Sequence, residues 1–145
     1  METTKTNWLA VIVAAVGGVL IGFLWYGLLF QQQWMAGNGI TMDESQAKLF
    51  KNGVEQPGSS VPMIVNMIAM VFYALVMNWL LKRSGANTLS TGLMTGGAVG
   101  LIMAVGVFVA NLFAMAPSSL SLVDGSYSLV LFAVMGAILG AWQKK

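Results

Sequence analysis

Residues 89–113 read LSTGLMTGGAVGLIMAVGVFVANLF, a run that contains no charged side chain. About 20 helical residues cross the hydrocarbon core of a membrane, so this run is long enough to span it as a helix. A strand is excluded, because an open sheet edge in lipid leaves backbone groups unpaired. The sequence therefore predicts a transmembrane helix here.

Three more uncharged, apolar runs accompany this one. Together the four runs predict transmembrane helices at about 8–30, 61–81, 89–113 and 127–142. The first run is longer than the apolar part of a signal peptide, and no A-x-A cleavage site follows it, so it predicts a retained helix. We expect an all-α fold, a polytopic bundle of four transmembrane helices that forms a single membrane domain over residues 1–145.

The overall composition agrees with this prediction. Hydrophobic residues make up 57% of the chain and charged residues 8%, with a mean hydropathy of +0.78. A soluble domain needs more charged surface than this. The net charge of +2 is small and scattered, which argues against nucleic acid as a partner. Cysteine and histidine are absent, which removes thiol chemistry and the commonest metal ligand, so we expect no cofactor and no metal.

The segment between the first two runs is long for a compact bundle and predicts some local order. Thr41-Met42-Asp43-Glu44 has the spacing of a capping box, and Gly53 stands where a left-handed residue would end a helix. These signals predict a short interfacial helix at about 42–52 in the first extracytoplasmic loop.

Basic residues indicate how the bundle is oriented. Five of the seven lie on one side of the predicted membrane, and the other two, Lys48 and Lys51, lie on the opposite side. The positive-inside rule then predicts that both termini are cytoplasmic. Tryptophans fall at the same interface, as an aromatic belt requires. The residues on the cytoplasmic side are Lys5, Lys82, Arg83, Lys144 and Lys145, with Trp8, Trp79 and Trp142.

Two segments are similar to the first and last helices of a bacterial family, domain of unknown function 1761. They are GFLWYGLLF at 22–30, followed by Trp34-Met35, and VMGAILGAW at 134–142. The family has an Asn-Ala-Gly-Tyr-like stretch before its last helix, and VDGSY at 123–127 matches this stretch less faithfully. The resemblance implies a small four-helix protein of the bacterial inner membrane with no established activity.

Glycines recur at helical spacing on three of the predicted helices. Small residues let helix backbones approach closely in lipid, where association relies on van der Waals contact. We expect these faces to pack within the bundle, with packing between subunits as the alternative that favours a homo-oligomer. The helix-packing residues are Gly18, Gly22, Gly92, Gly96, Gly100, Gly136 and Gly140.

Methionines form a stripe on the second predicted helix. Thioethers favour Cu(I), which makes metal handling one hypothesis. Methionine is also the usual filler of irregular gaps in a core, and the chain lacks the cysteine and histidine that would support a metal site. Core packing is therefore the favoured interpretation. The stripe consists of Met63, Met67, Met70 and Met77.

Polar side chains inside the predicted spans are few. Asn66 and Tyr73 share a face of the second helix, and with Tyr26 they predict a small polar cavity, although interhelical hydrogen bonds are the commoner explanation. No charged residue falls within a predicted span, which argues against ion-coupled transport. Motifs of hydrolases, nucleotide-binding loops and zinc proteases are absent, so we expect no catalytic residues.

These observations favour a non-enzymatic helical bundle that acts through protein or lipid contacts. Its expected partners are membrane lipids, a second copy of the chain or other subunits of a membrane complex. The alternative is a channel or carrier for a small neutral or apolar solute, with its path near Tyr26, Asn66 and Tyr73.

Overall fold

The computed structural model describes residues 5–143 and is mostly helical, with one small sheet. Four helical segments are each long and apolar enough to cross a membrane, as the sequence predicted. The elements in chain order are α1 (Trp8–Phe23), the π-helix η1 (Leu24–Leu29), α2 (Gln31–Gly37), β1 (Ile40–Met42), β2 (Leu49–Lys51), β3 (Val54–Gln56), α3 (Val61–Ser84), α4 (Leu89–Phe113) and α5 (Ser118–Ala141).

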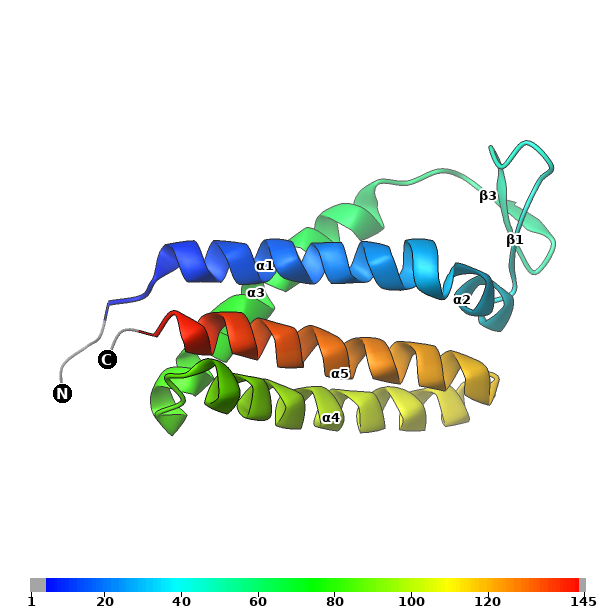
Figure 1. Ribbon diagram of the computed structural model, residues 1–145. Helices are drawn as coiled ribbons and strands as arrows, with labels where there is room; N and C mark the ends of the chain where they lie inside the picture. The colour runs from blue at the N-terminus through cyan, green and yellow to red at the C-terminus, as the bar shows by residue number, and fades with distance from the viewer. Residues whose placement is uncertain (1–4, 144–145) are drawn as a thin grey trace.

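Three of the long helices, α1, α4 and α5, lie roughly alongside one another, and α3 is inclined to them (Figure 1). α5 is the central helix, because it packs against α1, α3 and α4. The bundle has two distinct ends, the terminal end, where α1 begins and α5 ends, and the sheet end, where α2 and the strands lie (Figure 1).

Apolar side chains from α1, α3 and α5 form the core. Large side chains that are almost completely buried come from α3 and α5, and small ones come from α1. The principal members are Ala10, Val11 and Ala14 of α1, Met70, Met77 and Leu81 of α3, and Leu131, Met135 and Leu139 of α5. Of the predicted methionine stripe, Met70 and Met77 are therefore core residues, whereas Met63 and Met67 are exposed.

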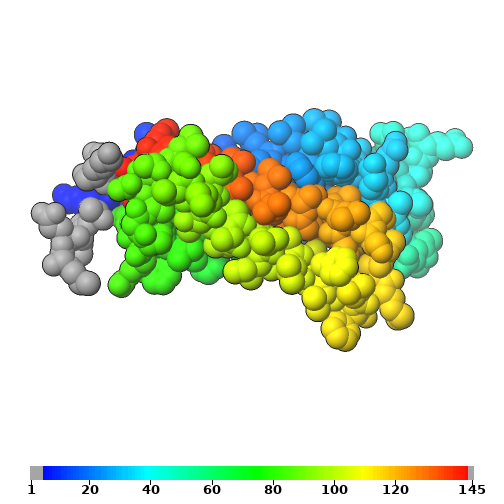
Figure 2. All heavy atoms as spheres, turned by 60° about the horizontal axis from the view of Figure 1, so that its bottom comes forward, coloured from blue at the N-terminus to red at the C-terminus, as the bar shows by residue number. Residues whose placement is uncertain are grey.

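α4 joins the bundle through glycines. Gly92 and Gly96 of α4 face Gly136 and Gly140 of α5, and Gly100 faces the backbone of Ser128 and Leu129, so closely that the two helix backbones are in contact. A Cβ added to Gly92 would lie 2.9 Å from Gly140 Cα, and one added to Gly136 would lie 2.9 Å from Gly96 Cα. We call these five residues the glycine seam. Figure 2 shows α4 and α5 lying side by side along their length.

The remaining predicted packing glycines lie on α1. A Cβ on Gly18 would meet the Met70 sulfur and the Leu131 side chain, and a Cβ on Gly22 would lie 3.4 Å from the Tyr127 hydroxyl. Both glycines therefore make room for side chains of α3 and α5. The glycines of α1, α4 and α5 all pack against other helices of the same chain. None of these three helix faces therefore requires a second copy of the protein.

The predicted start of the last helix at 127 is wrong. α5 begins at Ser118, because Pro117 has an extended backbone and its ring fixes φ at a value that suits the residue before a helix. Asp124 and Ser126, which precede the predicted start, are therefore inside α5. The expectation that no charged residue lies within a span is wrong for Asp124, since α5 is one of the four candidate spans.

The predicted interfacial helix at 42–52 is also wrong. This segment forms an antiparallel three-stranded sheet in the order β1-β2-β3. Asn52 and Gly53 both have positive φ, and Lys51 pairs with Val54 across them. Asn-Gly is the preferred pair for a two-residue hairpin turn, so the glycine that suggested the end of a helix belongs to a hairpin.

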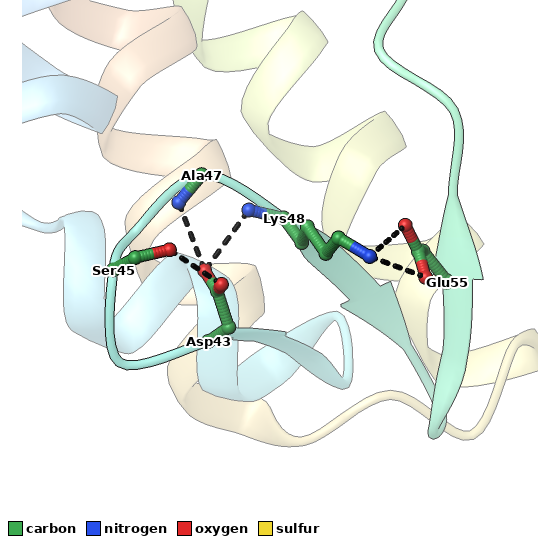
Figure 3. Close-up of polar contacts among 5 residues, drawn as sticks. All are labelled: Asp43, Ser45, Ala47, Lys48 and Glu55. Carbon is green, nitrogen blue, oxygen red and sulfur yellow. Dashed lines mark hydrogen bonds and ion pairs between the residues drawn. The ribbon is translucent and has the colours of Figure 1, made fainter.

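Asp43, the residue that suggested a capping box, organises the turn between β1 and β2. Its carboxylate accepts hydrogen bonds from the Ser45 hydroxyl and from the backbone N–H groups of Ala47 and Lys48, at 2.6 to 3.0 Å (Figure 3). The Ser45 hydroxyl and these N–H groups lower the pKa of Asp43 below its usual value. Lys48 forms an exposed ion pair with Glu55 of β3 at 3.1 Å.

The basic residues that predicted the orientation fall at opposite ends of the bundle. Lys82 and Arg83 lie in the last turn of α3, at the terminal end, and the Lys82 ammonium donates to the Thr6 hydroxyl at 3.4 Å. Lys48 and Lys51 lie at the sheet end. Lys144 and Lys145, which entered the same prediction, lie outside the described residues.

Candidate functional site: a polar cleft at the sheet end

The π-helix η1 is the first unusual feature of the sheet end. Its wider turn is closed by an i to i+5 hydrogen bond, in which the Phe30 N–H donates to the Trp25 carbonyl at 2.8 Å. π-helical turns are rare and occur often at functional sites. Here the wide turn carries two adjacent aromatic residues, Trp25 and Tyr26, both of which bond to α5.

Both bonds anchor η1 to the first third of α5. The Trp25 indole N–H donates to the Val123 carbonyl at 3.1 Å, and the Tyr26 hydroxyl donates to Asp124 Oδ1 at 3.0 Å. Asp124 lies six residues after the start of α5, which is about 9 Å along the helix axis. The aromatic pair of η1 therefore fixes a carboxylate at a defined depth in the bundle.

Aromatic rings surround this carboxylate. The Tyr26 and Tyr127 rings have centroids 4.8 Å apart, and the Tyr26 and Trp34 rings have centroids 5.7 Å apart. Tyr73 of α3 packs on Phe132 with a centroid distance of 5.3 Å. Such tilted and edge-on pairs stabilise the positions of the rings.

Tyr26, Tyr73 and Tyr127 line, together with Asp124, an open cleft of about 450 Å³ between η1, α3, α4 and α5. We call it the polar cleft. Its size falls in the range of small-molecule sites, which combine apolar walls with a few convergent polar groups. Its polar lining consists of Tyr26, Tyr73, Asn111, Asp124, Tyr127 and Ser128.

Asn111 of α4 contributes an unused donor to the polar cleft. Its side-chain Nδ2 is buried and has no hydrogen-bond partner among the described residues. A buried donor without a partner is destabilising by roughly 1–3 kcal/mol, so a native structure that contains one calls for an explanation.

A second cleft adjoins the first on the side toward the terminal end. It has a volume of about 240 Å³, and Tyr73 and Met103 line both clefts. We call it the apolar cleft, because its other walls are Phe72, Val76, Met77, Leu80, Val99 and Phe132. The two clefts together offer polar groups at the sheet end and an apolar surface beyond them.

The structure brings together part of the cavity that the sequence predicted. Tyr26 and Tyr73 both line the polar cleft, although they come from different helices. Asn66 is half-buried on α3 and is not among the residues that line this cleft. Asn66 lies seven residues before Tyr73 and shares its face of α3. However, α3 is inclined to the bundle, and its first half extends away from α4 (Figure 1).

Sequence reasoning missed Asp124, Tyr127 and Ser128 as members of the site. They were assigned to the start of the last helix because the predicted span began too late. A signal was present: Leu120, Val123, Tyr127 and Leu131 recur at three- and four-residue spacing, which extends the apolar face of α5 toward Pro117.

The sequence model of one protein family, described as protein of unknown function (DUF1761), matches residues 9–140. This match confirms the resemblance that the first and last helices indicated. No curated protein and no solved structure matches the chain.

Proposed function

Because the chain belongs to the DUF1761 family, whose description assigns no activity, we propose its function from the site: it is an integral membrane protein that binds an amphipathic, lipid-like molecule. One observation carries the proposal, the polar cleft that continues into the apolar cleft. A polar headgroup fits the first and an alkyl chain fits the second. The role is one of binding and involves no catalysis.

The proposed setting is the bacterial inner membrane, with both termini in the cytoplasm. Four apolar helices support membrane insertion, and the positions of the basic residues support the orientation. In this orientation the polar cleft lies in the outer half of the membrane. A lipid could enter sideways between α3 and α4, which contact each other little.

The orientation can be tested directly, because the chain has no cysteine of its own. We expect Lys51→Cys and Lys5→Cys to react on opposite sides of sealed inverted vesicles with a membrane-impermeant thiol reagent. Lys5→Cys should be labelled from outside the vesicle, and Lys51→Cys only after the vesicles are opened. Labelling of both variants from the same side would contradict the four-span topology.

Ligand binding can be tested by filling the junction of the two clefts. We expect Met103→Trp to abolish retention of a bound lipid, because Met103 lines both clefts and an indole would occupy the space. The matched control is Met94→Trp on the same helix, since Met94 is exposed and lines neither cleft. The measurement is native mass spectrometry of protein released from phospholipid nanodiscs.

The expected result is one retained lipid for the wild-type protein and for Met94→Trp, and none for Met103→Trp. Equal retention by all three proteins would show that lipids bind elsewhere on the surface. A wild-type protein that retains no lipid would remove the support for the proposal.

Carriage of a small neutral or apolar solute is a second proposal, supported by the presence of Tyr26 and Tyr73 in one cleft. Assembly into a homo-oligomer or a membrane complex is a further one. It is supported by large exposed apolar side chains at the ends of α3 and α4, such as Met63 and Phe113. Figure 2 shows the end of α4 projecting from the body of the protein. The mass of the particle in nanodiscs tests this assembly.

A further inference from the structure

We propose that the polar cleft recognises the ammonium group of an amphipathic amine, with Asp124 as its counter-ion and tyrosine rings as its walls. This inference rests on the proposed function and names the chemical class of its ligand. It follows from the juxtaposition of one carboxylate, three tyrosines and an unused amide donor in a single cleft.

Asp124 places a carboxylate inside one of the four candidate membrane spans. Ionisable residues inside a membrane span are rare, and they normally pair with one another or mark a binding site. Within residues 5–143, no lysine or arginine forms an ion pair with Asp124, and its carboxylate accepts one hydrogen bond, from the Tyr26 hydroxyl. A carboxylate in this position is stabilised by a cation, and the cleft gives a cation access to it.

Tyrosine rings form part of the walls of the polar cleft. Tyr26, Tyr73 and Tyr127 come from three different segments and line the same cleft as Asp124. A cation within about 6 Å of an aromatic face is attracted to the ring, and aromatic cages use this attraction to bind alkylammonium groups. A strongly hydrated metal ion would instead require several oxygen ligands, and no group of three or more acidic, cysteine or histidine side chains occurs in the described part of the chain.

Asn111 and the apolar cleft are the two remaining features of the site. Asn111 Nδ2 is a donor, so it does not compete with Asp124 for the ammonium group. The apolar cleft begins at Tyr73 and Met103, where the alkyl part of the ligand would continue. The expected ligand is therefore an alkyl chain that ends in an ammonium group.

The experiment compares dodecylamine with dodecanol, which has the same chain and a neutral headgroup, by titration calorimetry of the purified protein in a neutral detergent. We expect dodecylamine to bind at least about tenfold more tightly than dodecanol, because only the amine forms a charge pair with Asp124. We expect Asp124→Asn to remove this preference and to leave dodecanol binding unchanged. The asparagine keeps an acceptor oxygen for Tyr26.

The matched control is Glu55→Gln, which removes one negative charge from β3, outside the cleft. We expect this variant to keep the preference for the amine. Should Asp124→Asn fail to fold, Tyr127→Leu provides an independent test. It removes one aromatic wall and is expected to weaken dodecylamine binding by roughly two- to fivefold.

The possible failures are distinguishable. Equal binding of both probes, or an amine preference that survives Asp124→Asn, would overturn the ammonium inference while lipid binding stands. Binding of neither probe would overturn the proposed function itself.

An ammonium group can belong to a lipid headgroup or to a free amine, and nanodiscs separate these two sources. Retention of phosphatidylethanolamine in preference to phosphatidylglycerol of the same acyl chains identifies the lipid. Tight dodecylamine binding with no such preference identifies a free amine. Preferential retention of phosphatidylglycerol would contradict recognition of an ammonium group from either source.

Discussion

Gly96→Ile is expected to lower the free energy of unfolding by about 1–3 kcal/mol or more, the usual result of forcing extra carbon atoms into a packed interface. A Cβ at this position would overlap the Phe132 carbonyl oxygen and would approach Gly136 Cα. These neighbours are backbone atoms, which cannot rotate out of the way as a side chain would. α4 would therefore have to separate from α5.

The next residue provides a matched control, because a Cβ on Gly97 would meet no atom within 4 Å. Gly97→Ile changes the same residue type on the same helix, so intrinsic helix propensity affects both variants equally. We expect it to be neutral or slightly stabilising. Thermal unfolding in one detergent measures both, and equal melting temperatures for the two variants would disprove the close contact between α4 and α5.

Leu139→Ala is expected to lower the free energy of unfolding by about 2–5 kcal/mol, the range for removing a fully buried leucine. Leu139 has 0% exposure and packs in the core that α1, α3 and α5 share. Its loss would leave a cavity beside the central helix, and van der Waals contact is the main force that holds helices together in lipid.

Leu122→Ala is the control for this second substitution. Leu122 belongs to the same helix and is 71% exposed, so its truncation removes few contacts. We expect this variant to unfold within about 0.5 kcal/mol of the wild-type protein, as surface substitutions usually do. If Leu139→Ala were as mild as Leu122→Ala, α5 would not be the centre of the core.

The long helices could be predicted because each is uncharged and apolar over a length that suffices to cross a membrane. Every backbone group in the hydrocarbon region must be paired, so an uncharged run of sufficient length becomes a helix. α4 accordingly begins and ends at the residues predicted for it, 89 and 113. The glycines at four-residue spacing could be predicted for a similar reason, because they share one face of any α-helix.

The site was harder to predict because it depends on local departures from these regular patterns. The wide turn at Trp25 and Tyr26 cannot be recognised from the hydrophobicity of its segment, because the segment has the composition of an ordinary apolar helix. The inclination of α3, which leaves Asn66 outside the polar cleft, depends on tertiary packing. The hairpin at Asn52-Gly53 was recognisable from its dipeptide, but the competing helix-cap pattern at Thr41 to Glu44 concealed it.

The π-helix has a consequence for comparing this protein with other members of its family. A π-helical turn is closed by an i to i+5 hydrogen bond, and an α-helical turn is closed by an i to i+4 bond. The π-helix therefore corresponds to one extra residue in the chain. A relative that is one residue shorter between the counterparts of Gly22 and Phe30 should therefore form an uninterrupted α-helix there. Its indole and phenol rings would be rotated away from the last helix, so a gap of one position in an alignment would mark relatives that lack the two bonds to Val123 and Asp124.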